Sequence, residues 1–316
     1  MRKHILLTIL AIAALGACEQ ATRVQKPSMK LVQSILADTT GLRERVQNAG
    51  IIGAEGSITL LGEAADVKAL ARRFKEVDLM DNVDGREKRD SLPDFAGEII
   101  VGILTPRFSP DSLREVAVNG ALQAWDTTRR KESAKILIYP ASLQAAYGFH
   151  DVDTLQRIAG GKCHLLSPVS LLLDKAFEKT THVVVWTSEA AKTAKVWERS
   201  GKTPAVYWAD PALTPGEQLR DILRQYQVTG LPLDALIVDS YQMDWGALEE
   251  ELKIIRAHAT EEDTAFDKML SAQFKLYDPA DALIRTTYAI LREENLFAHR
   301  IARPVVKLYE YVPELY

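Results

Sequence analysis

Ile99-Ile100-Val101-Gly102-Ile103-Leu104 is the first of six short apolar runs between Glu98 and Ser240, and a segment long enough for a helix separates each run from the next. The other five runs are Ile136-Leu137-Ile138-Tyr139, His164-Leu165-Leu166, Val183-Val184-Val185-Trp186, Ala205-Val206-Tyr207-Trp208 and Ala235-Leu236-Ile237-Val238. Most runs are continuously apolar rather than alternating, as expected for strands that are covered on both faces. The pattern predicts an α/β fold with mainly parallel sheets flanked by helices.

Small or polar residues follow each run at once. Parallel strands place their carboxyl ends at one edge of a sheet, and sheets of this kind bind ligands in the crevice outside that edge. We therefore predict that hydroxyl and carboxyl side chains at the strand ends bind a small molecule: Thr105, Ser142, Thr187, Ser188, Asp239 and Ser240. The pattern assigns no catalytic role to any of them.

Composition and charge argue against several classes of partner. The chain has 316 residues, of which 47% are hydrophobic and 26% charged, which is usual for a globular protein. A formal net charge of −4 without a long basic run gives no basis for nucleic-acid binding. The turn Thr105-Pro106-Arg107-Phe108 lacks the glycines that bring backbone amides to a pyrophosphate, and the six histidines are scattered. We therefore expect no cofactor and no metal site.

The N-terminus has the pattern of a secretory signal. Arg2-Lys3-His4 precede an apolar run from Ile5 to Leu15, which is too short to span a bilayer. Leu15-Gly16-Ala17-Cys18 resembles the lipobox of bacterial lipoproteins, in which the cysteine is acylated and becomes the new N-terminus. We predict that residues 1–17 are removed and that acylated Cys18 anchors the protein to membrane lipid in the cell envelope, facing the periplasm or the cell exterior. A plain signal peptide with an incidental cysteine is the alternative.

The second cysteine, Cys163, stands at the start of a predicted strand. If Cys18 is acylated, no intramolecular disulfide can form, even in an oxidising compartment. The position favours a buried, unreactive thiol.

The rest of the chain divides into an N-terminal piece and a main domain. Residues 18–96 are predicted to be a tether and a small α+β appendage, with helices over residues 29–46 and 64–77 and a strand over residues 57–61. Residues 97–316 are predicted to be the α/β main domain. Within it, residues 246–274 have the pattern of a long helical stretch, and residues 304–312 that of a late strand.

The strand ends, taken in order, resemble a known family over about residues 98–256. The segments that carry the resemblance are Leu113-Arg114-Glu115-Val116, Ser133 to Ile138, Leu166-Ser167-Pro168, Val184 to Ala190 with Thr193, and Leu233 to Tyr241. Together they are similar to the aspartate/glutamate racemase superfamily. The resemblance implies two Rossmann-like lobes with one catalytic cysteine from each lobe on either side of an amino acid's α-carbon.

The chain departs from that family at the catalytic positions. Pro140, or Ser142 if the turn is shifted, stands where the resemblance places the first cysteine, and Ser240 stands where it places the second. A hydroxyl is far less acidic than a thiol, so these residues cannot exchange protons as a thiol pair does. Thr187 and Ser188 match family positions that hold the substrate carboxylate, which implies that they could still bind a small anion.

Three functional hypotheses remain open from the sequence. The first is an envelope lipoprotein with a racemase-like domain that binds, or acts differently on, a small polar metabolite. The second is a solute-binding lipoprotein of a transporter, in which aromatic residues near the strand ends stack on a sugar or nucleoside: Tyr139, Trp186, Trp208, Tyr241 and Trp245. The third is an envelope hydrolase that uses Ser142 or a strand-end aspartate.

Overall fold

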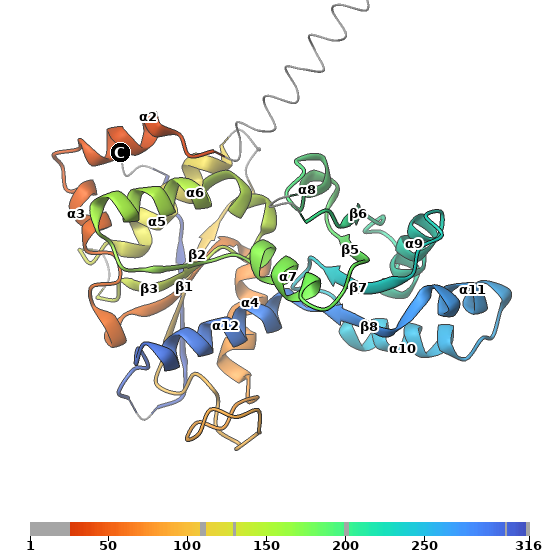
Figure 1. Cartoon of the computed structure of the whole chain (residues 1–316). Coiled ribbons are helices and arrows are strands. Elements are labelled where there is room, and N and C mark those ends of the chain that lie inside the picture. Colours follow the sequence, from red (N-terminus) through yellow and green to blue (C-terminus); the bar gives the residue numbers. More distant parts are fainter. Residues whose placement is uncertain (1–25, 108–111, 129–130, 199–201, 301, 314–316) are drawn as a thin grey trace, which may run out of the picture.

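Two parallel sheets flanked by helices form two lobes in the computed structural model (Figure 1). The structure describes residues 26–107, 112–128, 131–198, 202–300 and 302–313. The predicted α/β class with mainly parallel sheets in two lobes is confirmed. The predicted signal peptide and Cys18 lie outside the described residues.

The first sheet has five strands in the order β4-β3-β1-β2-β9, and all neighbouring pairs are parallel. Its strands are β1 (Ser57–Glu63), β2 (Ile99–Thr105), β3 (Ala134–Ile138), β4 (His164–Leu166) and β9 (Val305–Glu310). The late strand predicted over residues 304–312 is therefore present as β9, at one edge of the sheet.

The position of β1 corrects the domain boundary that the sequence placed at residue 96. β1 lies between β3 and β2, so that Leu60 faces Ile138 on one side and Gly102 on the other. Without β1 the sheet would be split in two, because β2 and β3 have no direct pairing in the strand order. The segment assigned to an appendage thus supplies the middle strand of the first lobe.

Helices cover both faces of the first sheet (Figure 1). On one face, α5 (Leu113–Trp125) and α6 (Ser142–Ala159) share a buried core with α2 (Met29–Leu36) and α3 (Leu42–Gln47). On the other face lie α4 (Ala64–Glu76) and α12 (Pro279–Glu293). The helix predicted over residues 29–46 is two helices, because Gly41 at the start of α3 has φ +108°, in the left-handed region that favours glycine.

The second sheet has four parallel strands in the order β6-β5-β7-β8. They are β5 (Val183–Trp186), β6 (Ala205–Tyr207), β7 (Leu233–Val238) and β8 (Leu270–Tyr277). One face packs on α9 (Pro215–Gln227), α10 (Trp245–Arg256) and α11 (Glu261–Met269), and the other on α7 (Pro168–Phe177) and α8 (Glu189–Thr193).

The stretch 246–274 is not one long helical segment. α10 ends at Arg256, and His258 adopts φ +54°, which breaks the helix. Thr260 then starts α11 with a capping box, and the chain continues as β8 beside β7. The alternation of Phe274 and Leu276 with polar neighbours was the signal for this strand.

Two helices carry the chain between the lobes. β4 leads into α7 and then into β5 of the second sheet, and β8 leads into α12, which returns to the first sheet. α7 and α12 pack against each other. The carboxyl ends of β3, β5 and β7 are thereby brought to a common junction, which is where the predicted ligand site should lie.

Candidate ligand site between the lobes

A single carboxylate gathers side chains from both lobes. Asp239 follows β7, and its Oδ2 accepts a hydrogen bond from Thr187 Oγ1 at 2.6 Å, just after β5. The same oxygen accepts from Ser142 Oγ at 2.5 Å, at the start of α6 in the first lobe, and from Trp197 Nε1 at 3.2 Å. Three of the six predicted residues therefore meet, and with Trp197 they form what we call the junction cluster.

Burial explains why each side chain of the junction cluster has a hydrogen-bond partner. Ser142 is 4% exposed and Thr187 5% exposed, and a polar group removed from water needs hydrogen-bond partners. Burial raises the pKa of the Asp239 carboxyl, while the hydrogen bonds from Ser142, Thr187 and Trp197 act in the opposite direction. All three donors are neutral, so no positive charge at the cluster balances an ionised Asp239.

The other three predicted residues do not join the cluster. Ser188 Oγ accepts from the backbone amide of Ala191 at 3.2 Å and caps α8. Ser240 Oγ accepts from the amide of Gln242 at 3.2 Å within the turn after β7. Thr105 is buried at the end of β2, opposite Glu63 of β1.

The turn after β7 makes further contacts with the first lobe. Tyr241 Oη donates to the backbone carbonyl of Pro140 at 2.8 Å, and Gln242 Nε2 donates to Asp66 Oδ1 at 3.1 Å. Asp66 lies in the first turn of α4, just past the end of β1. The sequence prediction missed Asp66 because it placed β1 and α4 outside the main domain.

The junction carries an excess of negative charge. Burial raises the pKa of Asp66, and the negative charges of Asp239 and Glu63 raise it further. The Gln242 hydrogen bond and Arg107 act in the opposite direction. Three carboxylates facing one guanidinium favour a cationic group over an anionic one.

Gln144 adds a buried donor to the same region. It lies on the first turn of α6, is 4% exposed, and its Nε2 has no hydrogen-bond partner among the described residues. Its Oε1 faces Gly62 at the end of β1. An unpaired buried amide is unfavourable by about 1–3 kcal/mol, which an acceptor on a ligand would relieve.

A hollow of about 430 Å³ lies beside the junction cluster. Ala145 and Val196 line it, close in sequence to Ser142 and Trp197 of the cluster, and Ser167 at the end of β4 supplies a hydroxyl. Apolar walls with a few polar groups, in this range of volumes, are typical of small-molecule sites.

The structure does not provide the geometry for a reactive Cys163 thiol or for a hydrolase triad at Ser142. Cys163 is buried just before the amino end of β4, whereas the junction lies at the carboxyl ends of the strands. Burial raises the pKa of its thiol to about 12. Ser142 donates directly to Asp239, without the imidazole that a hydrolase triad places between them. His150 lies two turns further along α6, about 12 Å away along the helix axis.

The aromatic residues near the strand ends separate into two groups. Tyr139 and Trp186 are buried in the cores, and the Tyr241 hydroxyl is bonded to Pro140. Trp208 and Trp245 are half-buried.

Within the part of the chain that the structure describes, no helix is long and apolar enough to cross a membrane, and no group of three or more His, Cys, Asp and Glu side chains could hold a metal ion.

Comparison with known proteins finds similarity in structure alone. No protein-family model and no curated protein matches the sequence. Glutamate racemase from Francisella tularensis, in complex with D-glutamate, superimposes with a TM-score of 0.52 at 13% identity, over 81% of this chain and 88% of that one. The fold resembles that of glutamate racemases.

Two further glutamate racemase structures superimpose on this chain to a similar extent. The enzyme from Thermus thermophilus, in complex with β-chloro-D-alanine, gives a TM-score of 0.52 at 13% identity, over 82% of this chain and 88% of that one. An isoform from Bacillus anthracis gives 0.50 at 14% identity, over 81% and 89%. At such identities the racemase-like likeness concerns the fold, and function has to be argued from the site.

Proposed function

We propose that this protein is a lipid-anchored envelope protein whose racemase-like domain binds a small polar ligand with an amino group between its lobes. The proposal includes the absence of racemisation by a thiol pair. The observation that carries it is the Asp239 carboxylate, which neutral donors from both lobes hold in place without a compensating cation.

The charges and donors at the junction define the ligand class. An ammonium group on the ligand would be attracted by Asp239 and Asp66, whereas a carboxylate on the ligand would be repelled by both. Gln144 Nε2 would donate to an acceptor on the ligand, such as a carbonyl oxygen. The hollow beside the cluster would hold a compact apolar part of the ligand. The anion that the resemblance implied for Thr187 and Ser188 fits poorly, because the Thr187 hydroxyl already donates to a carboxylate.

Calorimetric titration of the full-length chain tests the ligand class. The probes are L-alaninamide, D-alaninamide and ethanolamine, each compared with its N-acetylated form, which has no positive charge. We expect the amines to bind and the acetylated forms to bind at least roughly tenfold more weakly, since a charge-assisted hydrogen bond contributes about 1.5–3 kcal/mol. Asp239→Asn should remove the preference, whereas Asp267→Asn on α11 changes a carboxylate away from the junction and should keep it. Equal affinity for both forms would contradict the proposal.

Isotope exchange tests the proposed absence of racemisation. Incubation with D- and L-aspartate and D- and L-glutamate in deuterated water should leave the α-hydrogen in place. The only thiol besides Cys18 is Cys163, which is buried just before the amino end of β4. Rapid deuteration at the α-carbon would show that the junction performs proton transfer after all.

Labelling of cells with radioactive palmitate tests the anchor. Cys18→Ser should abolish incorporation of label and release the protein from the membrane fraction, while Cys163→Ser should keep both. Label that persists in Cys18→Ser would exclude acylation at the predicted site.

A further inference from the structure

We propose that a second hollow, at the carboxyl end of β8, binds a neutral saccharide. The hollow has a volume of about 550 Å³, within the range of small-molecule sites. Its walls come from both lobes and from the two connections between them: α4, α7, α10, the end of β8 and the start of α12. Nothing in the amine site proposed above requires this hollow.

Trp245 supplies an aromatic surface in this hollow. It is the first residue of α10, and Asp244 fixes the start of that helix by accepting from the amide of Ala247 at 3.0 Å. The indole is half-buried, so part of its surface is free to contact a ligand. The apolar C–H face of a sugar ring packs against such a surface, and the ring hydroxyls point outward to polar groups.

Positively and negatively charged side chains line the hollow in equal numbers. The cations are Arg73, Lys175 and Lys275, and the carboxylates are Glu249, Asp278 and Asp281. Arg73 pairs with Asp278 at 3.0 Å, and Lys175 lies 3.7 Å from Asp281.

This balance favours an uncharged ligand. The lining has no formal net charge, so it gives no long-range attraction to an anion or a cation. Ammonium and guanidinium groups donate hydrogen bonds and carboxylates accept them, and a hydroxyl does both, so a polyhydroxylated ring can bond to either kind. Glu249 is four residues after Trp245 on α10 and therefore lies on the same face, ready to accept from a hydroxyl of a ring stacked on the indole.

The two proposed sites differ in charge and in the residues that form them, so each proposal can be contradicted without affecting the other. The junction has an excess of carboxylates and requires Asp239. The hollow at β8 is balanced and requires Trp245. A saccharide that binds in Asp239→Asn and is lost in Trp245→Ala therefore concerns the second hollow only.

The test is saturation-transfer NMR and calorimetric titration of the full-length chain in a detergent without a sugar headgroup. The probes are D-glucose, D-galactose, N-acetyl-D-glucosamine, maltose and cellobiose, with glucose 6-phosphate and glucosamine as charged counterparts. We expect at least one neutral saccharide to bind and its charged counterpart to bind more weakly. Trp245→Ala should weaken binding at least roughly tenfold, and Trp245→Phe should retain most of it.

Matched variants make the result decisive. Trp208→Ala removes another half-buried indole, after β6, and should leave the affinity unchanged. Glu249→Gln should weaken binding less than Trp245→Ala, and thermal unfolding shows that each variant is folded. The proposal is overturned if none of the five neutral saccharides binds, if the charged counterparts bind more tightly, or if Trp245→Ala and Trp208→Ala behave alike.

Discussion

Asp239 at the junction of the lobes and Asp263 in the second lobe are each held by several donors, yet their pKa values move in opposite directions. The donors to Asp239 are two hydroxyls and an indole, and burial raises its pKa in spite of them. Asp263 accepts from the Thr260 hydroxyl at 2.8 Å and pairs with Arg220 at 2.8 Å. The Thr260 hydrogen bond, followed by Arg220, lowers the pKa of Asp263.

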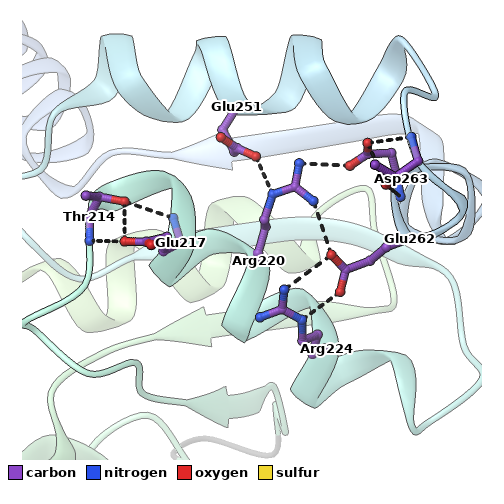
Figure 2. Close-up of polar contacts among 8 residues, drawn as sticks. Thr214, Glu217, Arg220, Arg224, Glu251, Glu262 and Asp263 are labelled. Atoms are coloured by element: carbon purple, nitrogen blue, oxygen red, sulfur yellow. Dashed lines mark hydrogen bonds and ion pairs between the residues drawn. The ribbon is translucent and has the colours of Figure 1, made fainter.

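The difference between the sites is the cation. Figure 2 shows Arg220 of α9 between Glu251 of α10 and the pair Glu262 and Asp263 of α11. Arg224, one turn along α9, pairs with Glu262 at 2.7 Å. The two guanidinium groups pair with these three carboxylates and connect three helices on one face of the second sheet.

Neutral donors can orient a carboxylate without neutralising it. At Asp239 the hydrogen bonds fix the geometry of the carboxylate while its charge stays uncompensated. A cationic ligand can therefore supply the missing positive charge. At Asp263 the compensating charge belongs to the protein, and the result is stability. A carboxylate that the fold positions but does not neutralise is therefore the better candidate for a binding group.

The largest effect should come from Arg220→Met. Its side chain is 18% exposed and contacts three carboxylates, one of them on the buried Asp263. Removing one partner from a largely buried pair leaves a charge without compensation, so we expect the free energy of unfolding to fall by about 3 kcal/mol. Urea denaturation measures the change.

Arg224→Met is the matched control on the same helix. Its side chain is 52% exposed and its partner Glu262 is 39% exposed, so the loss should stay below about 1 kcal/mol. Equal losses for the two variants would show that burial does not set the strength of the network.

Much of the fold followed from residue patterns. All six apolar runs are strands, and Thr214-Pro215 starts α9 with a capping box, as local sequence chemistry allows. The errors lie where tertiary contacts decide. Nothing within residues 57–63 indicates that β1 belongs between β2 and β3, and β8 is an edge strand whose half-exposed pattern is weak.

For the same reason, only three of the six residues predicted to bind a ligand meet in the structure. The rule that polar side chains meet at the carboxyl ends of parallel strands located Ser142, Thr187 and Asp239. It could not separate Ser188 and Ser240, whose hydroxyls bond locally to the backbone. Trp197 was not predictable, because it reaches Asp239 from beyond α8 rather than from a strand end.

An intermediate effect should come from the hydroxyl donors to Asp239. Ser142→Ala removes the donor from the first lobe, and Thr187→Val removes the donor from the second with little change in shape. Each should lower the free energy of unfolding by about 1–3 kcal/mol, because the remaining carboxylate loses a hydrogen bond to a charged group. If Asp239 connects the lobes, combining either change with Asp239→Asn should cost less than the sum of the single changes. Strict additivity in denaturation experiments would show that these contacts are energetically independent.

The pH dependence of stability gives the smallest effect and the most direct comparison of the two carboxylates. The folded-state pKa of Asp239 is raised, so the folded protein binds this proton more tightly than the unfolded chain does. Between the unfolded pKa, about 3.9, and the raised folded value, the stability of the wild type relative to Asp239→Asn should fall as pH rises. Asp263 has a lowered pKa, so its contribution is present above about 3.9 and is lost as pH falls through the folded value. The stability of the wild type relative to Asp263→Asn should therefore rise with pH. The slope for Asp239 is at most about 1.4 kcal/mol per pH unit, the limit for a single proton. Urea denaturation of the three proteins from acidic to neutral pH measures both slopes, and slopes of the same sign would remove the distinction between a compensated and an uncompensated carboxylate.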